Sequence, residues 1–166
     1  MQPGDGEMLA AAYERNRQHL APWDPERDDR FFTPEWQESH VAASLVESDA
    51  GRSARFVLIR DDHAIVGLVN LNNIVRGAFW SADLGYWIDR EHAGRGSMTR
   101  AVAAVREHAA SVLQLHRLQA ATLLHNAASQ RVLAANGFER IGIAPKYLRI
   151  AGEWQDHVLF QRILAA

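Results

Sequence analysis

The segment between residues 82 and 123 constrains the fold most strongly, because a strand pattern, two glycines, a helix pattern and a second strand pattern follow one another there. Residues 82–88 form a strand-like run, and so do residues 117–123. Between them, apolar residues recur at three-to-four spacing from Met98 to Val112, which predicts a helix with one apolar face. A strand, a crossover helix and a second strand normally lie with the two strands parallel. The segment therefore predicts one parallel strand pair.

Gly94 and Gly96 stand between the first of these strands and the helix. Glycine lets backbone N–H groups approach an anion with no Cβ in the way. The unpaired N–H groups and the positive end of the helix dipole then favour that anion. A cleft also opens where parallel strands part at their C-terminal ends. Both features predict a phosphate-bearing ligand at this place, and the absence of a following Gly-Lys-Ser/Thr argues against a P-loop nucleotide site.

The remaining patterns add helices and antiparallel strands. Thr33 and Pro34 resemble an N-cap and a first helical position, and Asn126 resembles an N-cap before a helix that ends at Asn136 and Gly137. Helices are predicted at residues 7–20, from 34 to about 48, from 99 to about 115 and after 126. Strands are predicted at residues 54–59, 64–71, 79–88, 117–123, 138–150 and 154–163.

These elements predict one α/β (α+β) domain over residues 1–166, with a mixed, mostly antiparallel twisted sheet, one parallel splayed strand pair and flanking helices. The formal net charge of -2 argues against general nucleic-acid binding. The lack of cysteine excludes disulfides and thiolate sites and is compatible with a cytoplasmic enzyme. The eight histidines show no metal-ligand spacing, so no metal is expected. No apolar run reaches the ~18 residues of a membrane span, and the first residues lack the pattern of a signal peptide.

Several short motifs occur in an order that is found in a known family. They are GRGSMT at residues 94–99 after the strand residues GYWI, NAAS at 126–129 and NGF at 136–138. In this order they resemble the GNAT superfamily of acyl-CoA-dependent N-acyltransferases. HLAPWDP at 19–25, NIVRGAF at 73–79 and WQDH at 154–157 are similar to the RimJ/RimL group of protein N-terminal acetyltransferases. The resemblance runs from about residue 7 to residue 163.

This resemblance implies an acetyl-CoA-dependent enzyme that acetylates a primary amine. The favoured acceptor is the N-terminal α-amino group of a protein of the ribosomal kind. The alternatives are a small amine, a polyamine or an antibiotic as acceptor, or an acyl-CoA-binding domain without catalysis. The acyl group can also be larger than acetyl, and the resemblance implies a monomer or a homodimer.

The resemblance also assigns residues to the cofactor. Backbone N–H groups would bind the pyrophosphate, those of Gly94, Arg95, Gly96, Ser97, Met98 and Thr99. The side chain of Arg95 adds charge, and Arg100 is a second candidate cation. The backbone of Tyr86, Trp87 and Ile88 would pair with the pantetheine arm. Asn126 and Ser129 would lie near the pantetheine and the sulfur.

The catalytic assignments rest on chemistry and on position. Acetyl transfer needs a neutral amine and a proton for the leaving thiolate. Asp83 is the first candidate for the base, since aspartate is unfavourable inside a strand. Glu153, Asp156 and His157 are the alternatives. Ser129 or Tyr147 would supply the proton to the thiolate.

Candidate acceptor-binding residues lie in the aromatic loop and near the end of the chain: Trp23, Phe32, Asp156 and His157. The acidic residues between Asp24 and Arg30 are expected to attract a cationic acceptor. Two features depart from the family pattern. No strand pattern precedes the first helix, and Ala93 and Met98 replace the usual residues of the glycine loop. Met98 is expected to leave less room beside a bound pyrophosphate.

Overall fold

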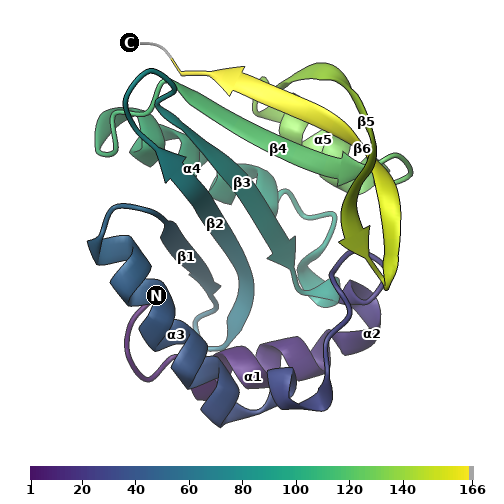
Figure 1. The fold of residues 1–166 in the computed structure, drawn as a ribbon. Coiled ribbons are helices and arrows are strands. Elements are labelled where there is room, and N and C mark those ends of the chain that lie inside the picture. The colour runs from purple at the N-terminus through teal and green to yellow at the C-terminus, as the bar shows by residue number, and fades with distance from the viewer. Residues whose placement is uncertain (165–166) are drawn as a thin grey trace.

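Six strands form one twisted sheet in the order β1-β2-β3-β4-β6-β5 (Figure 1). This computed structural model describes residues 1–164, and the last two residues of the expected domain lie outside the described range. The strands are β1 (Ala54–Ile59), β2 (Ile65–Val75), β3 (Ser81–Ile88), β4 (Arg117–Leu123), β5 (Glu139–Ile150) and β6 (Glu153–Ile163).

The strand directions confirm the predicted mixed sheet. β1, β2 and β3 are an antiparallel meander, and β5 and β6 are an antiparallel hairpin. β3 and β4 are the parallel pair, joined by a crossover helix. β6 then pairs antiparallel with β4 and connects the two halves of the sheet.

Helices cover both faces of the sheet. The helices are α1 (Gly6–Arg15), α2 (Arg17–Leu20), α3 (Pro34–Asp49), α4 (Ser97–Ser111) and α5 (Ala127–Ala135), with short 3₁₀ turns η1 (Asp29–Phe32) and η2 (Arg90–His92). α1 and α3 gather beside β1 and β2, while α4 and α5 lie on the other face (Figure 1). Leu9, Val41 and Leu68 are buried where α1 and α3 meet the sheet.

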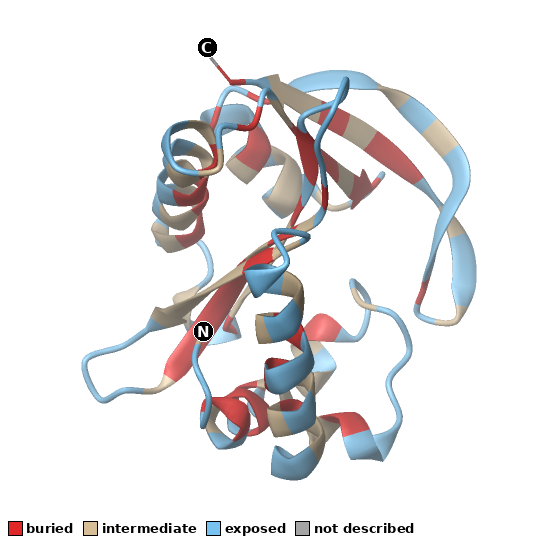
Figure 2. Cartoon of the chain, turned by 60° about the vertical axis from the view of Figure 1, so that its left-hand side comes forward, coloured by how far each residue is buried: buried red, intermediate tan, exposed pale blue. Residues whose placement is uncertain are grey.

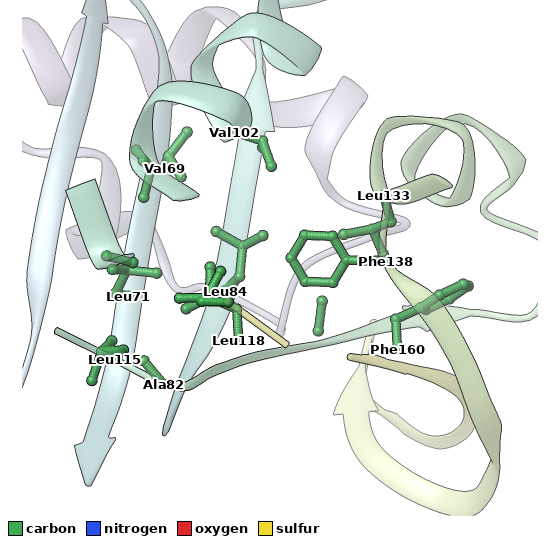
Figure 3. Packing of buried hydrophobic residues seen from close by; sticks show 14 of the residues in the cluster. Val69, Leu71, Ala82, Leu84, Val102, Leu115, Leu118, Leu133, Phe138 and Phe160 are labelled. Carbon is green, nitrogen blue, oxygen red and sulfur yellow. The ribbon is translucent and has the colours of Figure 1, made fainter. Parts of the chain in front are cut away.

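The main core lies between the sheet, α4 and α5. Val102 of α4 and Leu133 of α5 are fully buried against apolar side chains of β2, β3 and β4 (Figure 3). Each apolar face is buried because leaving such a side chain in water costs about 1.5–3 kcal/mol. The β5–β6 hairpin is less buried than this core, and most residues of β5 are exposed (Figure 2).

Several predicted boundaries need correction. The single helix expected at residues 7–20 is two helices, because the buried Asn16 interrupts it and turns its amide toward Ala12 and Asp89. α4 begins at Ser97 rather than Thr99, because Gly96 at φ 74° is its N-cap, and it ends at Ser111 rather than near Leu115. β2 continues to Val75, while the third strand begins at Ser81 rather than Phe79.

Residues 1–5 form no strand, as the sequence predicts. No helix in residues 1–164 has both the length and the apolar character to cross a membrane. Within the same residues, no group of three or more His, Asp and Glu side chains is arranged to hold a metal ion.

Candidate active site

The glycine loop presents a row of backbone N–H groups at the start of α4. Gly94 and Gly96 both have φ 74°, a left-handed conformation that glycine adopts without steric cost. Within residues 1–164, no protein acceptor bonds the N–H groups from Gly94 to Thr99. α4 has 15 residues, so its dipole adds a positive potential at this end. The loop therefore has the chemistry of an anion site.

Two side chains near the loop bear on its positive charge and on the room for a phosphate: Arg100 and Met98. The Arg100 guanidinium lies beside the loop. Its Nη2 donates to Ser97 Oγ at 3.3 Å, and its Nη1 would lie 3.4 Å from a Cβ added to Gly96. The expectation that Met98 narrows the phosphate site is wrong. Its side chain is 5% exposed and packs into the core, where an apolar thioether is more stable than in the loop.

A buried carboxylate anchors the beginning of this loop. Asp89 follows β3, and its side chain accepts hydrogen bonds from Arg15 Nε at 2.7 Å, Asn16 Nδ2 at 3.0 Å and the backbone of Glu91 at 2.9 Å. Asn16 in turn accepts a bond from the N–H of Arg90. Burial alone would raise the pKa of Asp89, but these bonds outweigh it and lower the pKa to about 2. The loop is thereby fixed to the end of α1.

β3 and β4 part directly after a short paired segment. They are in register from Ser81 opposite Arg117 to Asp83 opposite Gln119, and they diverge toward their C-terminal ends (Figure 1). A cavity of about 390 Å³ lies in this region. From β3 it is lined by residues 84–87, and from β4 by residues 120–123. The unpaired edges of the two strands leave backbone donors and acceptors for an extended ligand.

Ser129 and Tyr86 form a hydroxyl pair inside the cavity. Tyr86 Oη lies 2.8 Å from Ser129 Oγ and also donates to the Ser129 carbonyl at 3.1 Å. Burial raises the pKa of Tyr86 to about 12, so the phenol stays protonated. Asn126 Oδ1 accepts from the N–H of Ser129 at 3.1 Å, which confirms its predicted N-cap role. The pair offers protons at a point where a leaving group can receive one.

The other side of the cavity is aromatic and carries charge. Tyr13, Phe31 and Trp36 line it, with ring centroids 4.8 Å apart for Tyr13–Phe31 and for Phe31–Trp36. Arg55 Nη1 donates to His40 Nε2 at 2.5 Å. Burial, together with the charge of Arg55, lowers the pKa of His40, so the imidazole is neutral and accepts this bond.

The structure brings several predicted site residues together and leaves others elsewhere. Trp23, Trp87 and His157 line the cavity with Tyr86, Asn126 and Ser129. Phe32 lines an adjacent cavity of about 290 Å³, which shares residues with the first. Ile88 packs against the core.

Some predicted catalytic and acceptor-binding residues lie outside the lining of both cavities, among them Asp83, Asp156 and Tyr147. Asp83 is exposed, and its carboxylate accepts from Asn73 Nδ2 at 2.8 Å. Asp156 accepts from the backbone N–H of Lys146 at 2.8 Å, which is a contact within the β5–β6 hairpin. Tyr147 is 46% exposed, with its ring beside that of His157. Their assignments stay predictions that the cavity does not support.

Sequence reasoning missed other residues of the cavity. Asn70 approaches Gly85 so closely that a Cβ at position 85 would lie 2.9 Å from its Oδ1. Thr122 is 4% exposed, and within residues 1–164 its hydroxyl has no hydrogen-bond partner although it lines the cavity. A glycine inside a strand was the available signal for the first of these, whereas Thr122 looks like an ordinary strand residue.

Known proteins are similar to this chain in sequence and in fold. A family model described as an acetyltransferase (GNAT) domain matches residues 1–139. The ribosomal protein uS5-alanine N-acetyltransferase of Escherichia coli K12 is 36% identical over 156 residues, which cover 93% of this chain and 80% of that protein.

Two solved structures are also similar. Ribosomal-protein-S5-alanine acetyltransferase from Vibrio fischeri has a TM-score of 0.95 and 38% identity, over 99% of this chain and 90% of that one. Mycobacterium smegmatis RimJ, in complex with CoA-disulfide, has a TM-score of 0.93 and 30% identity, over 98% of this chain and 79% of that one.

Proposed function

Because this chain belongs to the acetyltransferase (GNAT) family, we propose that it transfers an acetyl group from acetyl-CoA to the N-terminal α-amino group of a protein, in particular a ribosomal protein. One observation carries the proposal. A single cavity begins at the parting of β3 and β4, passes the Ser129–Tyr86 pair and continues to the aromatic side. The parted strands and the aromatic side chains therefore line one cavity together with the hydroxyl pair, so that an acyl donor and an amine can meet there.

Acetyl-CoA fits the residues on the first side. The free N–H groups from Gly94 to Thr99 suit the pyrophosphate, and Arg95 and Arg100 add positive charge. The unpaired edge of β3 at Tyr86, Trp87 and Ile88 suits the amides of the pantetheine arm, as an added strand would. Trp87 and Tyr86 also contribute side chains to the cavity wall. No metal is required by this chemistry.

The hydroxyl pair suits the departing sulfur. When the amine attacks the thioester carbonyl, a C–N bond forms and the C–S bond breaks, so the thiolate needs a proton or a hydrogen bond. Tyr86 holds its proton at neutral pH, since burial raises the pKa of the phenol to about 12, and it shares a hydrogen bond with the Ser129 hydroxyl. We assign them to this step in preference to Tyr147, which lies outside the cavity lining.

The acceptor side suits the end of a polypeptide. Trp23, Phe31 and Trp36 offer apolar area to a first side chain, while Arg55 offers a donor to a peptide carbonyl. The relatives named for ribosomal-protein alanine acetylation support a protein N-terminus over a small amine. A ribosomal acceptor also supports the cytoplasmic location that the composition suggests.

Thiol release from acetyl-CoA tests the proposal. The acceptor panel has three members. The first is the N-terminal peptide of ribosomal protein uS5. The second is the same peptide with its α-amine blocked and a lysine side chain left free, and the third is the polyamine spermine. We expect kcat/KM to be highest for the free N-terminus and the blocked peptide to be inactive. Preference for spermine would assign a small-amine acceptor. CoA binding without thiol release for any acceptor would refute the enzymatic function.

A further inference from the structure

One carboxylate faces the cavity where the two substrates would meet. Within residues 1–164, Asp24 is the only Asp or Glu that lines it. Asp24 also lines the adjacent cavity, so it stands at the junction of the two. Its side chain is 37% exposed, which leaves the carboxylate within reach of a ligand. The acids that the sequence analysis favoured, Asp83 and Asp156, are bonded elsewhere.

The surroundings hold Asp24 in place although it belongs to a loop. Its N–H donates to the carbonyl of Leu20 at 3.1 Å, and its own carbonyl accepts from the N–H of Ala151 at 3.0 Å. The ring of Trp23 lies against that of His125, with centroids 5.3 Å apart. The loop is therefore fixed to the end of α2, to the β5–β6 turn and to the residue before Asn126. The last contact joins it to the segment that carries Ser129.

The charge of Asp24 is only loosely neutralised. Its ion pair with Arg27 is 3.6 Å long, and the Arg27 guanidinium lies over the ring of Phe31 at 4.5 Å. Burial raises the pKa of Asp24 above its usual value, although Arg27 opposes this shift. The other ionisable groups that line the two cavities around it are Tyr13 from α1, Arg17 from α2, Glu26 from its own loop, His40 from α3, Arg55 from β1, Tyr86 from β3 and His157 from β6.

We propose that Asp24 binds the α-ammonium group of the acceptor and takes the proton that must leave before the amine can attack. The inference rests on the proposed function and assigns its general base. An α-ammonium has a pKa of about 8, so most of it is protonated at neutral pH. In a cavity whose other charged side chains include Arg27 and Arg55, Asp24 is the group that attracts it.

The proton balance of the step is complete. The ammonium gives one proton to the Asp24 carboxylate, which later releases it to solvent. The free amine attacks the thioester carbonyl, the C–N bond forms and the C–S bond breaks. As the C–S bond breaks, the second amine proton passes to the Ser129–Tyr86 pair, and the pair gives one proton to the thiolate, so both hydroxyls end protonated.

The test compares Asp24→Asn with wild type in thiol release from acetyl-CoA with a peptide acceptor. We expect kcat/KM to fall by about 100-fold or more at neutral pH, with unchanged CoA affinity, and the deficit to shrink as pH rises through the pKa of the acceptor amine. With an acceptor whose amine has a low pKa, the loss of kcat/KM in Asp24→Asn should also be smaller, because that amine is already neutral. Asp24→Glu should recover part of the activity.

The control is Asp61→Asn, which removes an exposed carboxylate in the turn between β1 and β2, outside the lining of both cavities. It should retain wild-type kcat/KM. Asp24→Ser serves as a second neutral variant if the asparagine variant does not fold. An active Asp24→Asn enzyme with the wild-type pH profile, or a deficit of equal size at every pH, would overturn this inference alone. A wild-type enzyme that releases no thiol with any acceptor would overturn the proposed function, and the inference with it.

Discussion

Replacing Asp89 by asparagine should weaken both the fold and CoA binding, because Asp89 anchors the glycine loop to α1. Its pKa falls from the usual 3.8 to about 2 in the folded protein. At about 1.4 kcal/mol per pKa unit, the carboxylate contributes roughly 2–3 kcal/mol to the free energy of unfolding at neutral pH. The asparagine side chain would keep the shape of the carboxylate but lose the charge that pairs with Arg15.

The sign of the pH dependence follows from the depressed pKa. The contribution is fully present above the unfolded pKa and is lost as pH falls from about 5 to about 2. Urea denaturation of wild type and Asp89→Asn over this range should show a stability gap that closes toward the acid end. Asp62→Asn is the control, because Asp62 is exposed and solvent screens its pair with Arg60, so this variant should change stability much less than Asp89→Asn does. A constant gap between wild type and Asp89→Asn at all pH values would refute the reasoning.

Three further predictions concern the same site and the core. Gly96→Val should reduce CoA affinity, measured by calorimetry, by at least about 10-fold. A valine at this positive φ is strained by about 1–2 kcal/mol, and its side chain would cover the row of N–H groups. The control Gly51→Val, at φ 69° outside the loop, should leave CoA affinity unchanged. Tyr86→Phe should lower kcat by roughly 10-fold with little change in KM, since it removes the phenol hydroxyl, which bonds both the hydroxyl and the carbonyl of Ser129. Leu118→Ala should lower the free energy of unfolding by about 2–5 kcal/mol in urea, because Leu118 is fully buried in the core. CoA affinity equal to wild type in Gly96→Val would contradict the anion site. An unchanged kcat in Tyr86→Phe would contradict the role of the phenol, and an unchanged unfolding midpoint in Leu118→Ala would contradict the core assignment.

Local patterns predicted most of the fold. The glycine pair, the Asn126 cap and the Thr33-Pro34 start are each determined by neighbours in sequence, and the structure contains all three. The parallel pair of β3 and β4 also followed, because a crossover helix leaves few other arrangements. Boundaries shifted where one residue met a distant partner, as at Asn16, whose amide bonds Asp89.

The site was harder to predict because its residues meet through tertiary contacts. Ser129 bonds Tyr86, 43 positions away, and nothing local to either residue announces that contact. Asp83 was chosen as an aspartate inside a strand, and its role as the base stays a prediction; in the structure its carboxylate accepts a hydrogen bond from Asn73 and lies outside the cavity lining. Asp24 was part of an acidic loop in the sequence. Its place in the cavity depends on its own bond with Ala151 and on the contact of the neighbouring Trp23 with His125.

The most direct test of the central claim is mass spectrometry of ribosomal protein uS5 after incubation with the enzyme and acetyl-CoA. The account predicts one added acetyl group on the α-amine of the N-terminal residue, dependent on acetyl-CoA and strongly reduced in the Gly96→Val variant. An unmodified α-amine, with acetyl groups on lysine side chains or nowhere, would contradict it.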